Sequence, residues 1–158
     1  EELGADGAGG SLLQMPAGGS LRPASLASVE ERQHYIRMQG SDVFKFAVRI
    51  MDEAGKRVVA QAGLEMDQVD LVVPHQANMR IISAAASRLG LPEEKFFVNV
   101  ECYGNTSAAS IGLALDEAAR SGLLKHGDHV VLVGFGAGLT WSALVIKWWA
   151  EGDQHGSC

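Results

Sequence analysis

The sequence has little of what marks several classes of protein. Its only two cysteines, Cys102 and Cys158, have the spacing of neither a metal site nor a disulfide framework, which favours a reducing compartment such as the cytoplasm and no bound metal. It has no uninterrupted run of about 18 apolar residues. Residues 1–10 lack the basic flank and apolar stretch of a signal peptide. We therefore expect neither a membrane span nor secretion.

An excess of basic residues is also missing. The chain has 13 Lys and Arg against 19 Asp and Glu, a net charge of -6, which disfavours binding to nucleic acid. Hydrophobic residues make up 47% of the 158 residues and charged residues 20%, a composition typical of a globular protein. A chain of this length buries roughly 70% of the surface that it exposes when unfolded. We expect one compact layered unit.

Apolar periodicity predicts the elements of the first half. A short apolar stretch at residues 12–15 predicts a strand, followed by a Gly- and Pro-rich loop. From Ser41, a candidate N-cap, apolar residues recur at helical spacing as far as residue 62. This pattern predicts one long helix, with Gly55 as its weak point.

The second half contains two successive strand–helix patterns and a final pair of strands. Residues 70–73 predict a strand and residues 77–89 a helix; residues 96–100 predict a second strand, followed by a turn and a second helix that ends near Gly122. Residues 130–133 and 141–149 predict two strands whose glycine-rich connection is too short for a parallel crossover. The pattern predicts an α/β fold with a mixed sheet over residues 1–150 and a flexible tail over residues 151–158.

Three polar or glycine-rich segments directly follow predicted strands: residues 74–78, 103–107 and 135–138. Loops at the carboxyl ends of strands are where α/β proteins assemble their sites. A single histidine such as His75, or a single Asn105 after a glycine, is more typical of a structural residue. Together, however, an imidazole and an amide can donate hydrogen bonds to one developing oxyanion, and a glycine-rich backbone can donate to another. This combination favours acyl chemistry.

A nucleophile for such chemistry is missing from these segments. The chain has no Gly-x-Ser-x-Gly motif, and Cys102 ends a predicted strand without a cation beside it in sequence. We expect Cys102 to be structural and the acyl-carrying residue to lie elsewhere.

Three motifs resemble those of β-ketoacyl-acyl carrier protein synthase III, a condensing enzyme of the thiolase fold. They are His75-Gln76-Ala77-Asn78-Met79-Arg80-Ile81 after a DLVVP strand, Tyr103-Gly104-Asn105-Thr106-Ser107-Ala108, and the segment from Gly134 to Trp141, GFGAGLTW. The resemblance implies the C-terminal half of a thiolase-like fold, a layered α-β-α arrangement with a mixed sheet. It also implies that the nucleophilic cysteine lies in an N-terminal half.

The resemblance implies a role for each motif. His75 and Asn105 match the catalytic pair that stabilises the enolate formed when malonyl-acyl carrier protein loses carbon dioxide. The acyl group comes from coenzyme A, which takes part as a thioester substrate, and no cofactor is implied. The implied active-site loop contains Phe135, beside the nucleophile, and the backbone of Gly136, Ala137 and Gly138, which binds the acyl oxyanion through the Ala137 amide. The implied carrier-protein segment consists of Gln76, Ala77, Asn78, Met79 and Arg80, with Asn78 also near the pantetheine arm.

The implied partners are the half with the cysteine, acyl carrier protein, acyl-coenzyme A and a second copy of the whole enzyme. One alternative is another thiolase-fold condensing enzyme, of the polyketide-starter or long-chain type. A second is a non-catalytic partner subunit, because a chain without its nucleophile cannot turn over alone. For Arg80, the alternative is an ordinary solvated helix face shared with Ser83 and Ser87.

Overall fold

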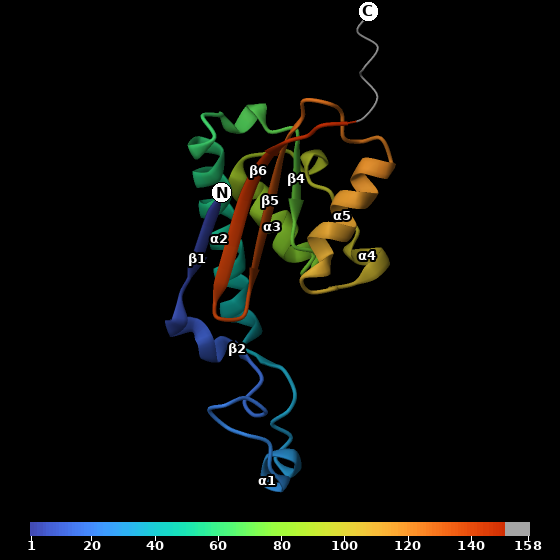
Figure 1. Ribbon diagram of the computed structural model, residues 1–158. Coiled ribbons are helices and arrows are strands. Elements are labelled where there is room, and N and C mark those ends of the chain that lie inside the picture. The colour runs from blue at the N-terminus through green and yellow to red at the C-terminus, as the bar shows by residue number, and fades with distance from the viewer. Residues whose placement is uncertain (151–158) are drawn as a thin grey trace, which may run out of the picture.

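The computed structural model describes residues 1–150, so the predicted flexible tail at 151–158 lies outside the described residues. Figure 1 shows a layered body with an arm that projects from it. The strands are β1 Glu2–Ala5, β2 Leu13–Gln14, β3 Arg37–Met38, β4 Leu71–Pro74, β5 His129–Gly136 and β6 Thr140–Lys147. The α-helices are α1 Leu26–Glu30, α2 Gly40–Gln61, α3 Met79–Leu89, α4 Val100–Tyr103 and α5 Ala109–Arg120, with short 3-10 helices at Gly7–Leu12, Met66–Gln68 and Glu93–Lys95.

The main sheet is mixed, as predicted, with the strand order β1-β6-β5-β4. β4 and β5 run parallel, with Val72 opposite Val131. β5 and β6 form the predicted antiparallel hairpin around the glycine turn. Every residue of β4 is buried, which fits its uninterrupted apolar sequence and the helices on both sides.

β1 is an edge strand that the sequence interpretation missed. It pairs antiparallel with β6 and places Gly4 beside Trp141, where an added Cβ would come within 2.2 Å of the indole ring. Glu2 accepts hydrogen bonds from Arg57 of α2 (2.8 Å from Nε) and from Trp141 Nε1 (3.2 Å). The bond from Arg57 holds the pKa of Glu2 below its usual range. These contacts tie the start of the chain to the sheet.

The predicted long helix is α2, which continues through Gly55 for 22 residues without a break. Its N-cap is Gln39, whose side chain makes no capping hydrogen bond, so the prediction of Ser41 as the cap is wrong. Gly55 lies where α2 meets α3, because a Cβ there would come 3.1 Å from Leu89 Cδ2. The predicted weak point is therefore a close helix–helix contact.

The predicted strand at residues 96–100 is also wrong. Phe96 makes one parallel bridge to Val72, and Val100 already begins α4. The ladder stops because the backbone N–H of Asn99 donates to the side chain of Gln76 instead of to a neighbouring strand. A buried side chain thus turns the chain toward the loop that carries Asn105.

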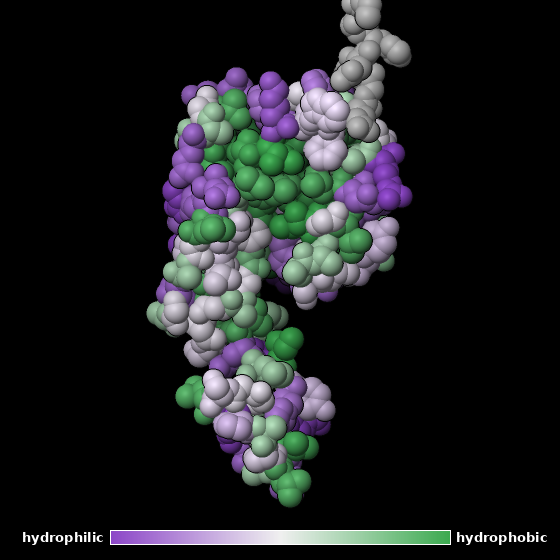
Figure 2. All heavy atoms as spheres, viewed as in Figure 1, coloured by the Kyte–Doolittle hydropathy of each residue, from purple (hydrophilic) through white to green (hydrophobic). Residues whose placement is uncertain are grey.

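The core has three clusters of buried residues: two lie on opposite faces of the sheet, and a small third one joins Phe46 and Ile50 of α2 to Leu139. α2 and α3 cover the face that includes Val131 and Val133, and α5 covers part of the other face, over β4 (Figure 1). This arrangement confirms the predicted layered α-β-α fold. On the α5 face, Leu132, Leu144 and Ile146 are only half-buried. Figure 2 shows hydrophobic side chains gathered over β5 and β6 on this side.

The arm consists of residues 15–38 and extends from the end of the body where β2 pairs with β3 (Figure 1). β2 confirms the strand predicted at residues 12–15, whereas α1 was not predicted. Ser25 and Ser28 form a reciprocal capping box at α1, and Ser28 also bonds to His34. The apolar side chains of the arm are nevertheless exposed, most of all Leu21, Leu26 and Ile36.

Candidate active site

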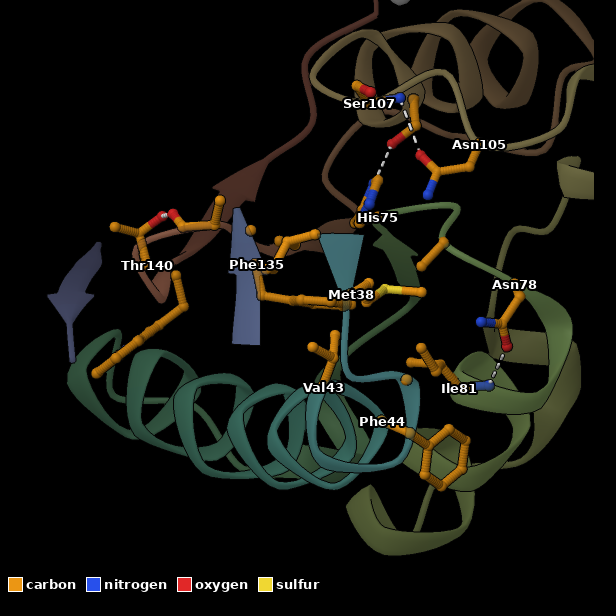
Figure 3. A pocket seen from close by; sticks show the side chains of 18 of the residues that line it. Met38, Val43, Phe44, His75, Asn78, Ile81, Asn105, Ser107, Phe135 and Thr140 are labelled. Carbon is orange, nitrogen blue, oxygen red and sulfur yellow. Dashed lines mark hydrogen bonds between the residues drawn. The ribbon is translucent and has the colours of Figure 1, made fainter. Parts of the chain in front are cut away.

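The three predicted loops meet at one cavity of about 1620 Å³. His75 lies just after β4, Asn105 lies between α4 and α5, and Phe135 lies near the end of β5; all three line the cavity (Figure 3). Ordinary small-molecule pockets measure about 300–1,000 Å³. The larger volume fits a site that is open on one side.

The His75 side chain is held on two sides. Its Nδ1 lies 2.6 Å from Ser110 Oγ in the first turn of α5. Its ring makes an edge contact with Phe135, with 5.4 Å between the ring centroids. Burial lowers the pKa of His75 below its usual value, so the imidazole is neutral at pH 7. With Nδ1 occupied by Ser110, Nε2 is the ring nitrogen left for a ligand.

The Asn105 side chain is oriented by its own loop. Its Oδ1 accepts a hydrogen bond of 3.0 Å from the backbone N–H of Ser107. This bond leaves the Nδ2 group free to donate, and Figure 3 shows this nitrogen on the His75 side of the side chain. The loop needs a left-handed backbone at Gly104, with φ of 68°. The arrangement presents an amide donor and an imidazole to the same cavity.

The glycine turn between β5 and β6 forms another wall. Phe135, Gly136 and Ala137 line the cavity, whereas Gly138 does not. Gly138 has φ of +138°, and an added Cβ would lie 2.7 Å from Thr140 Cγ2, so only glycine fits there. Thr140 Oγ1 donates to the Ala137 carbonyl at 3.0 Å. Gly138 therefore shapes the turn instead of contacting a ligand.

The segment implied to bind a carrier protein divides into two parts. Gln76 is only 1% exposed, and its Nε2 donates to the carbonyls of Pro74 (2.8 Å) and Phe97 (3.1 Å). Its Oε1 accepts from Asn99 N at 3.0 Å. A buried side chain with these bonds cannot contact a docked protein, so that prediction is wrong for Gln76.

The remaining residues of this segment, Ala77, Asn78, Met79 and Arg80, line the cavity. Asn78 is the N-cap of α3, where its Oδ1 accepts from Ile81 N at 3.0 Å and leaves Nδ2 free (Figure 3). The exposed Arg80 guanidinium lies over the Phe44 ring, 5.7 Å from its centroid. This end of α3 thus presents polar donors and one cation at the rim.

Some lining residues were not predicted from the sequence. Ser110, buried beside His75, lies one position before the apolar Ile111 in the pattern of α5. Its place in the first turn after a polar loop was the available signal. Met15, Ile36 and Met38 of the arm also line the cavity. Their signal was a set of apolar residues in an otherwise glycine-rich opening.

Cys102 is exposed and does not line the cavity, while Cys158 lies beyond the described range. Among residues 1–150, no group of three or more His, Cys, Asp or Glu side chains could hold a metal ion. Within the same range, no helix combines the length and apolar character required to cross a membrane.

Residues 59–148 match the protein family described as 3-oxoacyl-[acyl-carrier-protein (ACP)] synthase III C terminal. The β-ketoacyl-[acyl-carrier-protein] synthase III of Desulfitobacterium hafniense is 58% identical over 151 residues, which cover 96% of this chain and 46% of that protein. The crystal structure of β-ketoacyl-[acyl carrier protein] synthase III from Thermus thermophilus matches with a TM-score of 0.81 and 48% identity, covering 93% of this chain and 44% of that one. A priming β-ketosynthase of a polyketide pathway matches with a TM-score of 0.79 and 35% identity, covering 95% of this chain and 44% of that one.

The chain spans less than half the length of these relatives. The matched region contains the strand, helix and hairpin elements that position His75, Asn105 and Phe135. Both the sequence match and the fold agree with the three motifs described above. The chain therefore belongs to the 3-oxoacyl-[acyl-carrier-protein] synthase III family and corresponds to its C-terminal part.

Proposed function

We propose that this chain is the C-terminal part of a condensing enzyme that joins an acyl group from acyl-coenzyme A to malonyl-acyl carrier protein, the first condensation of fatty acid synthesis. The observation that carries the proposal is the pair of unoccupied donors, His75 Nε2 and Asn105 Nδ2, at one cavity. Two hydrogen-bond donors at one cavity suit an oxyanion that develops during the reaction.

The reaction has three steps. A cysteine thiolate attacks the acyl thioester, and coenzyme A leaves as its thiol once it takes up a proton. The malonyl group then loses carbon dioxide, and the electron pair of the broken C–C bond forms an enolate. The enolate carbon attacks the acyl-cysteine thioester, forms the new C–C bond and releases the cysteine thiolate.

His75 and Asn105 act in the decarboxylation step. Both donate hydrogen bonds to the thioester oxygen of the malonyl group, which becomes negative as the enolate forms. Because burial lowers the pKa of His75, the ring donates as a neutral imidazole instead of as an acidic imidazolium that would protonate the enolate. The Ala137 amide in the glycine turn stabilises the other oxyanion, on the acyl-cysteine, with the Phe135 ring beside the nucleophile.

The rim of the cavity binds the carrier protein. Carrier proteins are acidic, so the exposed Arg80 supplies a charge of the right sign although the chain as a whole carries -6. Ala77, Asn78 and Met79 extend from Arg80 into the cavity wall. The free Nδ2 of Asn78 is placed to bind an amide carbonyl of the pantetheine arm.

The nucleophilic cysteine belongs to the part of the relatives that this chain does not match. The half-buried apolar side chains on the α5 face of β5 and β6 are the surface that this N-terminal half covers. A homodimer of the whole enzyme and a cytoplasmic location, in keeping with the scarcity of cysteine, complete the proposal.

The test is condensation by the full-length protein that contains this chain. With acyl-coenzyme A and malonyl-acyl carrier protein, the proposal expects an acylated cysteine by intact-protein mass spectrometry and a β-ketoacyl-carrier product. A protein that acylates no cysteine and forms no product contradicts it. The similarity to a polyketide priming enzyme makes a second candidate, and a series of acyl-coenzyme A and carrier substrates distinguishes the two.

A further inference from the structure

We propose that Ser110 is a positioning residue that holds His75 as the neutral tautomer with its proton on Nε2. The catalytic meaning of this tautomer rests on the proposed function, whereas the tautomer itself is a property of the folded protein. Ser110 is 1% exposed and lies in the first turn of α5, 35 residues after His75 in sequence.

Two hydrogen bonds define the position of the Ser110 hydroxyl. Its oxygen lies 2.6 Å from His75 Nδ1. It also accepts the backbone N–H of Gln76 at 3.2 Å. The backbone donor cannot reverse its role, so one lone pair of the hydroxyl oxygen is always occupied by Gln76.

The hydroxyl proton of Ser110 then determines the tautomer of His75. If Nδ1 carried the proton, it would donate to Ser110 Oγ, and the buried hydroxyl proton would have no acceptor of its own, since the described residues offer it no other hydrogen bond. If Nδ1 is bare, the hydroxyl donates to it and both groups are satisfied. The second arrangement leaves no buried polar group unpaired, and it places the ring proton on Nε2.

It matters that the partner of His75 Nδ1 is a hydroxyl, because many histidines are oriented by a carboxylate. A carboxylate on Nδ1 would stabilise the charged imidazolium and raise the pKa of the ring. In residues 1–150, His75 makes its only ring hydrogen bond to a hydroxyl, and its other ring contact is Phe135. A neutral partner orients the ring without adding negative charge, which suits a histidine that must donate to an enolate.

Nuclear magnetic resonance of the full-length enzyme with ¹⁵N-labelled histidine tests the tautomer directly. The His75 signals are identified by their loss in His75→Gln. We expect a protonated Nε2 and a bare, hydrogen-bonded Nδ1 near neutral pH in the wild type. In Ser110→Ala, Nδ1 loses its hydrogen-bond shift and the Nδ1–H form gains population. A protonated Nδ1 in the wild type, or an Nδ1 signal that does not move in Ser110→Ala, overturns the proposal.

Kinetics of the same variants separate positioning from general destabilisation. Ser110→Ala should slow malonyl decarboxylation about tenfold, the size expected for one hydrogen bond, and Ser110→Thr, which keeps a hydroxyl, should restore most of the rate. The control is Ser121→Ala at the other end of α5, which loses the hydrogen bond from its hydroxyl to the Ala118 carbonyl and should keep the wild-type rate. Equal losses in Ser110→Ala and Ser121→Ala contradict the proposal.

The wild-type histidine signals are measured without turnover, so this test does not depend on activity. The only variant that it requires is His75→Gln, which assigns the signals. An enzyme that forms no condensation product, but shows a protonated Nε2 and a bare Nδ1, contradicts the proposed function and supports the role of Ser110. An enzyme that forms the condensation product but carries a protonated Nδ1 supports the proposed function and contradicts the role of Ser110.

Discussion

Gln76 Oε1 accepts a hydrogen bond of 3.0 Å from the backbone N–H of Asn99, and this bond ties the loop of His75 to the segment that leads to Asn105. The same side chain donates to the carbonyls of Pro74 and Phe97. One buried amide therefore satisfies backbone groups on both sides of the candidate site. Gln76 therefore links two loops of the candidate site, and its buried side chain is not available to a partner protein.

Gln76→Leu should destabilise the full-length enzyme, because an apolar side chain leaves buried backbone groups without partners. We expect a loss of at least about 2 kcal/mol in the free energy of unfolding, or roughly 5 °C in melting temperature. Gln61→Leu, at the exposed end of α2, is the matched control and should change little. Similar melting temperatures for the two variants would show that the hydrogen bonds of Gln76 contribute little to the free energy of unfolding.

Only part of this site could be predicted from the sequence. The loops of His75 and Phe135 lie at the carboxyl ends of β4 and β5, which are parallel, so their convergence at one sheet edge follows from general α/β geometry. The Asn105 loop follows α4 instead, and its approach to this edge does not follow from that rule. The burial of Gln76 was not predictable, because a glutamine between histidine and alanine gives no sign that two of its three backbone partners, Phe97 and Asn99, lie more than 20 residues away. The same contact explains the wrong strand at residues 96–100, where a side chain replaces the neighbouring strand as the partner of Asn99.

Other features could not be predicted from the sequence for a similar reason, because they depend on contacts between distant residues. β1 has only four residues, ELGA, and is stabilised by pairing with β6 about 140 positions later. No local pattern signals such a partner. Ser110 belongs to the same class, since its significance depends on a contact with His75, which lies 35 residues away.

The chain by itself should associate. Leu3 on the edge strand is 74% exposed, and the α5 face of β5 and β6 shows half-buried apolar side chains. Exposed apolar surface of this kind promotes self-association. Light scattering after size-exclusion chromatography should show dimers or larger species for residues 1–158. Co-expression with the N-terminal half should convert them into one defined complex, whereas a monodisperse monomer with a cooperative melt would contradict the expectation.

Arg80→Glu should impair the use of malonyl-acyl carrier protein and leave self-acylation by acyl-coenzyme A nearly intact. Only the first reaction requires docking of an acidic protein, so we expect its kcat/KM to fall roughly tenfold at low salt. The wild-type advantage should shrink as salt rises, because exposed charges are screened over about 8 Å at 0.15 M. Arg88→Glu, at the far end of α3, is the control. Equal effects of the two reversals, or equal effects on both reactions, would make Arg80 an ordinary surface residue.

The lowered pKa of His75 predicts how the stability of the enzyme depends on pH. The unfolded histidine binds a proton with a pKa of about 6.5, whereas burial makes the folded one resist protonation. The unfolded state therefore binds more protons as the pH falls. His75 contributes its full stability above about pH 6.5 and loses it as the pH falls toward the folded pKa. Melting temperatures between about pH 8 and pH 5 should fall more steeply for the wild type than for His75→Gln; parallel curves would contradict this account.

The most direct test of the account compares the two half-reactions in His75→Ala and Asn105→Ala, made in the full-length enzyme. Removing one oxyanion donor costs about 10²–10³ in rate, so malonyl decarboxylation and condensation should fall by that factor in each variant. Acylation of the cysteine by acyl-coenzyme A should fall much less, because the enolate does not form in that step. Equal losses in acylation and decarboxylation would contradict the assignment of His75 and Asn105 to the enolate.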